Sequence, residues 1–103
     1  MIRVKIFKNG SEVTGFRVSG HSGYKDAGED IVCAAISVLA VNTINSIEVF
    51  TNDDPNIEDG DGLLDVRFNG SCSDSSKLLV DSFLLGVKGV IDEYGTEFVR
   101  LEE

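Results

Sequence analysis

The sequence predicts one α+β domain over residues 1–103, a two-layer sandwich in which a mixed sheet of about four strands packs against two helices. Three observations predict this fold class. Residues 2–8 and 64–68 alternate apolar and polar side chains, as half-buried strands do. Residues 75–94 place apolar side chains at the spacing of an amphipathic helix, and residues 31–41 form a nearly continuous apolar run. The expected order of elements is β-β-α-β-α-β.

The chain is expected to open with a hairpin. In residues 2–8, isoleucine and valine alternate with arginine and lysine. Asn9-Gly10 follows, and this dipeptide is the strongest short signal for a hairpin turn. Residues 13–18 then form the returning strand, in which Gly15 marks a candidate β-bulge.

Residues 30–49 are predicted to form the first helix, after a loop over residues 21–29 that has glycines but no periodicity. Ser37 is the only polar side chain in residues 31–41, so this helix is apolar nearly all round. Such a helix has to be covered on two sides. We expect the sheet to cover one side and a second copy of the chain to cover the other, which predicts a homodimer.

An acidic segment follows the first helix. Residues 51–62 contain the only proline and five acidic side chains, and they are expected to form a surface loop. Cation binding by these carboxylates is an alternative, but their spacing does not match the alternating ligands of an EF-hand loop, so a solvated loop is favoured. A strand over residues 64–68 comes next, and Asn69-Gly70 ends it.

The C-terminal part is predicted to add a helix and a short strand. Ser73 or Asp74 is a suitable N-cap for a helix over residues 75–94. Gly95 is expected to stop this helix, and residues 98–101 form the last strand.

The charge of the chain narrows the choice of partners. It has 18 acidic and 9 basic side chains, for a net charge of −9. Proteins bind nucleic acid through lysine and arginine, so this charge disfavours a nucleic-acid partner and favours a basic one.

The first residues are too polar for a signal peptide, and no apolar run approaches the length of about 18 residues that crosses a membrane. We therefore expect a cytoplasmic protein with no membrane partner.

The candidate chemistry centres on Cys33 and His21. Cys33 is expected in the first turn of the helix over residues 30–49, where unpaired backbone N–H groups and the helix dipole favour a thiolate. His21, the only histidine, precedes it across the loop. A cysteine and a histidine are the minimal set for acyl transfer through a thiol. The alternative is that Cys33 is a small packed side chain and His21 an ordinary surface residue.

Two further residues could support this pair. Asp30 lies three residues before Cys33 and could orient His21, or it could simply complement the helix dipole. Ser37 lies four residues after Cys33, on the same helix face, and could donate a hydrogen bond there or bond back to a backbone carbonyl. Cys72 has no histidine of its own, and no Cys-x-x-Cys pair supports a metal site, so neither metal nor cofactor is expected.

The segment that holds these residues resembles the signature of a known family. It reads GHSGYKDAGEDIVCAAIS over residues 20–37. The ribosomal-processing cysteine protease family, called Prp, has approximately GHA, a variable loop, and then G-x-DIVCAAVS. The sequence departs from this pattern at Ser22, where alanine is usual, and at Ile36, where valine is usual. The resemblance extends over the rest of the chain in length, acidic character and order of elements.

The resemblance implies a specific activity. Members of the family are small bacterial homodimers that remove an N-terminal extension from the twenty-seventh large-subunit ribosomal protein, cutting after an aromatic residue, and so serve ribosome assembly. It implies that Cys33 is the nucleophile and His21 the general base. It also implies a flexible loop over the site that includes Ser22, Gly23 and Gly28.

Two other functions remain as alternatives. One is a non-catalytic acidic module that binds a basic segment of a ribosomal protein. The other is a structural dimer in which the apolar helix serves only for association. A buried and unreactive Cys33 would favour the binding module, and the structural dimer predicts that His21 can be replaced without loss of function.

Overall fold

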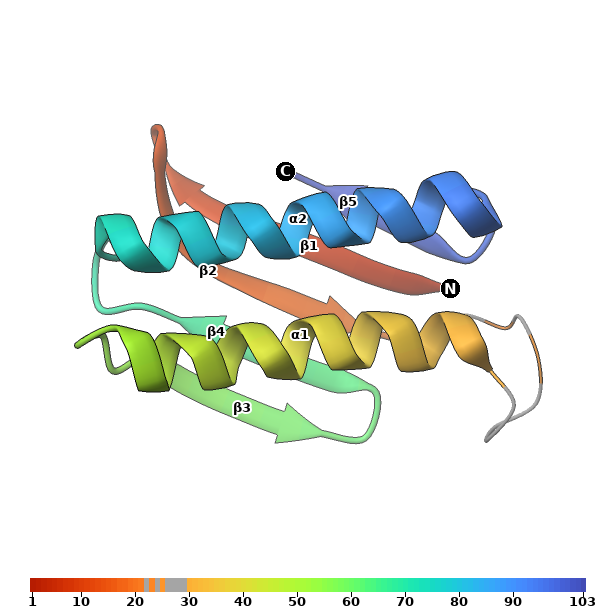
Figure 1. Cartoon of the computed structure of the whole chain (residues 1–103), viewed down its shortest axis with the longest axis horizontal. Helices are drawn as coiled ribbons and strands as arrows, with labels where there is room; N and C mark the ends of the chain where they lie inside the picture. Colours follow the sequence, from red (N-terminus) through yellow and green to blue (C-terminus); the bar gives the residue numbers. More distant parts are fainter. Residues whose placement is uncertain (22, 24, 26–29) are drawn as a thin grey trace.

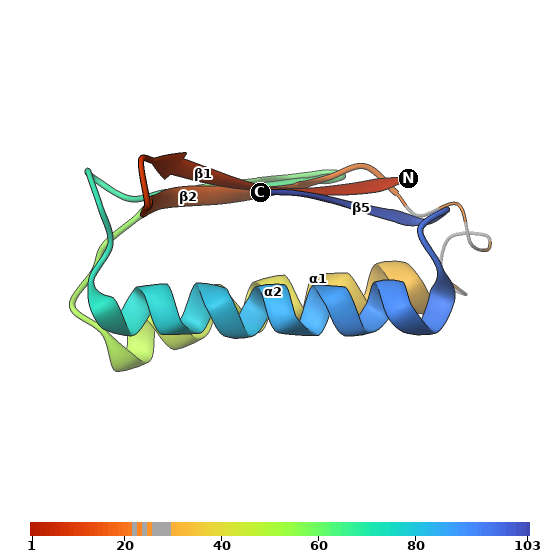
Figure 2. The ribbon, with the colours of Figure 1, turned by 90° about the horizontal axis from the view of Figure 1, so that it is seen from above.

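The structure, a computed structural model, describes residues 1–21, 23, 25 and 30–103. Two helices run side by side in opposite directions (Figure 1), and both cover the same face of one sheet (Figure 2). The elements in chain order are β1 (Ile2–Asn9), β2 (Glu12–Ser19), α1 (Ile31–Phe50), β3 (Asn56–Gly60), β4 (Leu63–Arg67), α2 (Asp74–Tyr94) and β5 (Val99–Glu102). The predicted α+β sandwich with a mixed sheet and two helices is confirmed.

The sheet has five strands in the order β3-β4-β2-β1-β5. Its pairs are antiparallel except β1 with β5, which are parallel. The predicted irregularity of the second strand is present, because Phe7 pairs with Gly15 while Lys8 pairs with Val13, which leaves Thr14 without an opposite residue. The register of β1 with β2 brings the end of β2 beside the N-terminus of the chain.

The fifth strand corrects the expectation of about four strands and of a loop over residues 51–62. Within that segment, Asn56–Gly60 forms β3, which pairs with β4 along the edge of the sheet. All five of its residues are exposed, so no apolar alternation marked it as a strand. The overlooked signal was Asp61-Gly62, a typical two-residue hairpin turn, which joins Gly60 to its partner Leu63.

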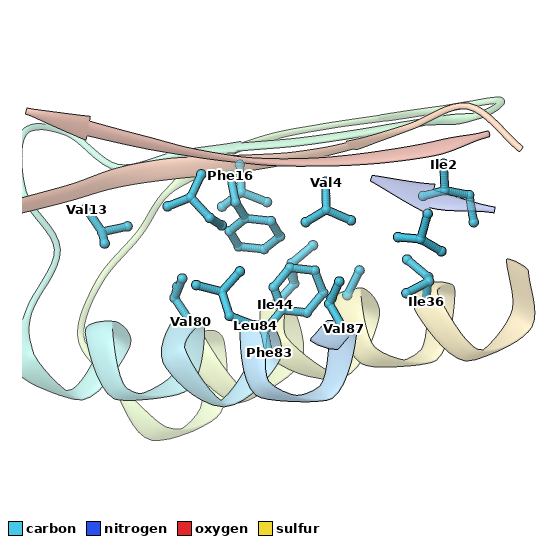
Figure 3. Packing of buried hydrophobic residues seen from close by; sticks show 14 of the residues in the cluster. Ile2, Val4, Val13, Phe16, Ile36, Ile44, Val80, Phe83, Leu84 and Val87 are labelled. Carbon is cyan, nitrogen blue, oxygen red and sulfur yellow. The ribbon is translucent and has the colours of Figure 1, made fainter. Parts of the chain in front are cut away.

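The core fills the space between the sheet and the helices (Figure 3). β1 contributes the alternating residues that the sequence predicts, Ile2, Val4 and Ile6, each no more than 3% exposed. At the centre, the ring of Phe16 in β2 packs against Phe83 in α2, with ring centroids 5.1 Å apart. This contact fixes the amphipathic helix on the sheet.

Truncating Phe83 tests this packing. Because its ring is 2% exposed and packs against another aromatic ring, Phe83→Ala is expected to lower the free energy of unfolding by about 3–5 kcal/mol. Ser82→Ala in the same helix is the control, since Ser82 is polar and exposed, and its effect should stay within about 0.5 kcal/mol. Denaturant unfolding of both variants measures the difference, and equal losses would contradict this description of the core.

The start of α2 is held by a distant carboxylate. Ser73 is the N-cap, and its hydroxyl accepts a hydrogen bond from the Ser76 amide. Asp53 in turn accepts hydrogen bonds from the amide and hydroxyl of Ser73 and from the hydroxyl of the buried Ser76. These bonds, led by the one from the Ser73 hydroxyl, hold the pKa of the Asp53 carboxyl below its ordinary value. The segment before β3 is thereby tied to α2.

This network makes stability depend on pH. Asp53→Asn is expected to lower the free energy of unfolding at pH 7 by about 1 kcal/mol, because charged hydrogen bonds are lost at a half-buried site that water partly screens. The folded-state pKa of Asp53 is lowered, so its contribution is present above the unfolded-state pKa and is lost as the pH falls through the folded-state value. The difference between wild type and variant should therefore shrink in acid. Asp54→Asn, at an exposed neighbouring position, is the control and should leave the free energy of unfolding at pH 7 near the wild-type value.

α1 corrects one expectation about apolar length. With 20 residues, it is the one helix of the described chain that is long and apolar enough to cross a membrane, whereas no apolar segment of that length was expected. Length and composition are weak grounds, because core helices of soluble proteins meet the same test. In this fold α1 packs one side against the sheet, through Val32, Ile36, Ala40, Thr43, Ile44 and Ile47.

Candidate active site

Three segments that are distant in the sequence meet at one end of the molecule. They are the end of β2, the turn between β3 and β4, and the first turn of α1 (Figure 1). His21 follows the first of these segments and Cys33 lies in the last. Both side chains line one cavity of about 220 Å³, together with residues of β3 and β4. The fold thus brings the predicted nucleophile and base to the same site.

A second cavity that is also lined by this pair completes the site. It has a volume of about 400 Å³ and is shared by the predicted residues and their neighbours. His21, Cys33 and Ser37 line both cavities. The full lining of the second cavity is His21, Gly23, Lys25, Asp30, Cys33, Ala34 and Ser37. All four side chains proposed from the sequence, including Asp30, therefore border one continuous region.

The helix start holds Cys33 in place. Asp30 is the N-cap of α1 and accepts a hydrogen bond of 2.9 Å from the Cys33 amide to Oδ1. Cys33 is the third residue of the helix, and its side chain is half-buried. The dipole of α1 points its positive end toward this position, which favours an anion there. The Cys33 amide itself is engaged by Asp30, so an oxyanion at this site needs other donors.

The role of Asp30 can be separated into capping and charge. Asp30→Asn retains an N-cap acceptor and is expected to keep the free energy of unfolding within about 0.5 kcal/mol of wild type, whereas Asp30→Ala should lower it by about 1 kcal/mol. If the carboxylate serves only as a cap, Asp30→Asn will retain peptide cleavage. If it also orients His21, the same variant will lose activity without losing stability.

The remaining predicted residues fall in different places. Ser37 is exposed and lines both cavities with Cys33. Further along α1, the Thr43 hydroxyl donates a 2.7 Å hydrogen bond back to the Leu39 carbonyl oxygen. Gly23 is exposed with a φ of +72°. Ser22 and Gly28, two residues of the expected loop over the site, lie outside the described residues.

Cys72 is separate from this site. It is half-buried against the core and lines neither of the two cavities. Burial, the largest influence, raises the pKa of its thiol. In the part of the chain that the structure describes, no three histidine, cysteine or acidic side chains are grouped to hold a metal ion. Cys33 is therefore the thiol that shares a cavity with the histidine.

Sequence reasoning missed what the β3–β4 hairpin contributes to the site. Asp59, Gly60, Gly62 and the first residues of β4 line the first cavity opposite Cys33. The rest of its wall is largely apolar and comes from β1, β2 and α1. Because residues 51–62 were expected to be a solvated loop, no residue of that segment was assigned to the site. The Asp61-Gly62 turn was the one available signal.

Comparison with known proteins identifies the family. The model of the cysteine protease Prp family matches residues 1–99. Ribosomal processing cysteine protease Prp from Staphylococcus aureus is 31% identical over 104 residues, both in strain Mu50 / ATCC 700699 and in strain NCTC 8325 / PS 47. Each alignment covers 98% of this chain and 97% of the relative.

Solved structures agree with this assignment. A crystal structure of the essential ribosomal processing protease Prp from S. aureus, in complex with a covalently linked product peptide, has a TM-score of 0.91 at 30% identity and covers 99% of this chain and 98% of that chain. The same protein in complex with a substrate peptide has a TM-score of 0.85 at 28% identity, with the same coverage. The resemblance found in the sequence is confirmed: the chain belongs to the Prp family and is a cysteine protease.

Proposed function

We propose that this protease removes the N-terminal extension of the twenty-seventh large-subunit ribosomal protein, with Cys33 as nucleophile and His21 as general base. The observation that carries the proposal is that the only histidine and the cysteine at the start of α1 line the same two cavities. Two relatives that are 31% identical are ribosomal processing proteases, and this supports a ribosomal protein as substrate.

The reaction proceeds in two acyl-transfer steps. His21 accepts the proton of the Cys33 thiol, and the thiolate attacks the carbonyl carbon of the scissile peptide bond. The carbon–nitrogen bond then breaks, the imidazolium gives its proton to the leaving amine, and the N-terminal extension stays on sulfur as a thioester. Water attacks the thioester, with His21 again accepting the proton, and the released thiol regains it. The substrate loses its extension and the enzyme returns unchanged.

The shape and charge of the protein support this choice of substrate. The apolar wall of the first cavity suits an aromatic side chain next to the scissile bond. Ribosomal proteins are basic, and a chain with a net charge of −9 attracts them over a distance. Because this substrate is made and assembled in the cytoplasm, we propose that the enzyme acts there.

The test is cleavage of the precursor itself. Wild-type protein is incubated with the extended ribosomal protein, and intact masses are followed with time. The expected result is a single cut after an aromatic residue of the extension, together with a transient added mass on the enzyme equal to that of the released segment less one water. A precursor whose two terminal fragments never appear, although the thiol of Cys33 reacts with an alkylating reagent, would contradict the proposed substrate.

A homodimer is also part of the proposal. The outer faces of α1 and α2 expose large apolar side chains, among them Val38 at 67% and Leu85 at 73%. Between the helices lies a groove of about 610 Å³ whose walls are almost entirely apolar. Apolar area of this extent on both helices favours burial against an identical face of a second copy.

Sedimentation distinguishes a dimer from a monomer. Val38→Asp is expected to convert a dimer to a monomer, because it places a charge in the proposed interface. Asn9→Asp, at an exposed polar position at the end of β1 and away from both helices, is the control and should leave the dimer intact. A wild-type protein that sediments as a monomer at micromolar concentration would contradict the dimer without affecting the proposed chemistry.

A further inference from the structure

The turn between β3 and β4 lies directly against the only histidine. Gly62 occupies the second position of this two-residue turn with a φ of +67°, a conformation that favours glycine. A Cβ atom at Gly62 would lie 3.1 Å from Nε2 of His21, 3.6 Å from Cε1 and 3.7 Å from Cδ2. The imidazole therefore occupies the space that any other residue at this turn would fill with its side chain.

The backbone of the same glycine fixes where His21 leaves the sheet. The amide of Gly20 donates a 2.9 Å hydrogen bond to the carbonyl oxygen of Gly62. On its other side, Gly20 lies against the N-terminal residue, where a Cβ atom would come within 2.3 Å of the Met1 oxygen. The residue before His21 is thus held between the hairpin turn and the start of β1. Gly62 therefore contacts both the backbone just before His21 and the ring of His21.

We propose that Gly62 is a positioning residue of this protease, one that seats the His21 imidazole for proton transfer with Cys33. The inference rests on the proposed role of His21 as the base. Gly62 acts by leaving room: any side chain at its position pushes the ring by a few tenths of an ångström. Proton transfer depends on heavy-atom distances that vary by only about 0.6 Å, so this displacement weakens catalysis rather than binding. We expect Gly62→Asn to lower kcat about tenfold, since a misplacement of about 1 Å costs about a hundredfold.

Gly10 provides a matched control. It also lies in a hairpin turn with a φ of +64°, but a Cβ atom there would meet nothing within 4 Å. Asparagine tolerates this conformation better than other side chains do, so Gly62→Asn and Gly10→Asn impose the same backbone demand. Only the first places atoms against the imidazole. Gly62→Ala and Gly10→Ala form a second pair that adds a single carbon, in case the larger side chain prevents folding.

The unique histidine allows a readout that does not depend on activity. The imidazole carbon-bound protons of His21 give one set of NMR signals, because the chain has no other histidine. The signals are recorded over a pH titration, and kcat and KM are measured on the extended ribosomal precursor. We expect both Gly62 variants to move the His21 signals and to lower kcat, with KM changed by less than about twofold. Both Gly10 variants should leave all three quantities at wild-type values.

The outcomes distinguish the positioning role of Gly62 from the role of His21 as base. His21 signals that stay unchanged in the Gly62 variants, or that move equally in the Gly10 variants, would overturn the positioning role. Signals that move in the Gly62 variants while kcat stays at the wild-type value would support the contact but overturn the positioning role, whereas the role of His21 as base is tested separately by replacing His21 itself. Thermal unfolding of each variant confirms that the measurements refer to folded protein.

Discussion

Replacing Cys33 with alanine is expected to abolish peptide-bond cleavage while the protein stays folded. The loss should be at least about a thousandfold in kcat, because the nucleophile of a covalent mechanism has no substitute in the site. Alanine suits the third position of α1, since it is a strong helix former and Cys33 is only half-buried. The unfolding midpoint should therefore change little. Product formation by intact mass and thermal unfolding measure the two effects.

Cys72 is the matched control for this substitution. It is also half-buried, but it packs against the core away from both cavities, and burial raises the pKa of its thiol. Cys72→Ala should keep wild-type cleavage. A thiol-alkylating reagent at neutral pH should label Cys33 far faster than Cys72 in the wild type. Undiminished cleavage by Cys33→Ala would show that a different group attacks the peptide bond.

The second large effect is expected from His21→Gln. Glutamine keeps a polar side chain of similar length but cannot take up a proton, so kcat should fall by about a hundredfold to ten-thousandfold, with KM nearly unchanged. His21 is exposed, so its replacement removes little packing, and the free energy of unfolding should stay within about 0.5 kcal/mol of wild type.

Cleavage by His21→Gln at the wild-type rate would mean that another group accepts the thiol proton. Because the chain has a single histidine, no second imidazole can take its place.

Periodicity predicted the parts of the fold that bury apolar side chains. The alternation of β1 and the helical spacing of α2 gave their bounds to within one or two residues. The buried faces of these elements can be predicted from the sequence, because their apolar side chains lie on the face that packs against the core. Asp65 is a buried residue that apolar periodicity does not predict. It lies on the outer face of β4 but is only 5% exposed, because Arg17 and Arg67 cover it with ion pairs of 2.7 and 2.9 Å.

Only part of the candidate site could be predicted from the sequence. Cys33 and His21 stand out because their chemistry is rare in this chain, and the family resemblance fixed their order. The contact of Gly62 with His21 could not be predicted, because it joins two residues that are 41 positions apart and depends on strand order. Glycine allows this contact because it has no side chain, and a sequence pattern does not show which neighbouring residue approaches a glycine so closely.

β3 has a consequence for the behaviour of the protein in concentrated solution. The strand lies at the open edge of the sheet, where unpaired backbone groups invite a strand from another molecule. This strand carries Glu58 and Asp59, and the turn carries Asp61. When the β3 edges of two molecules approach, these negative charges repel one another. The poor strand-forming composition that hid β3 from pattern analysis thus protects the molecule from fibre-like growth.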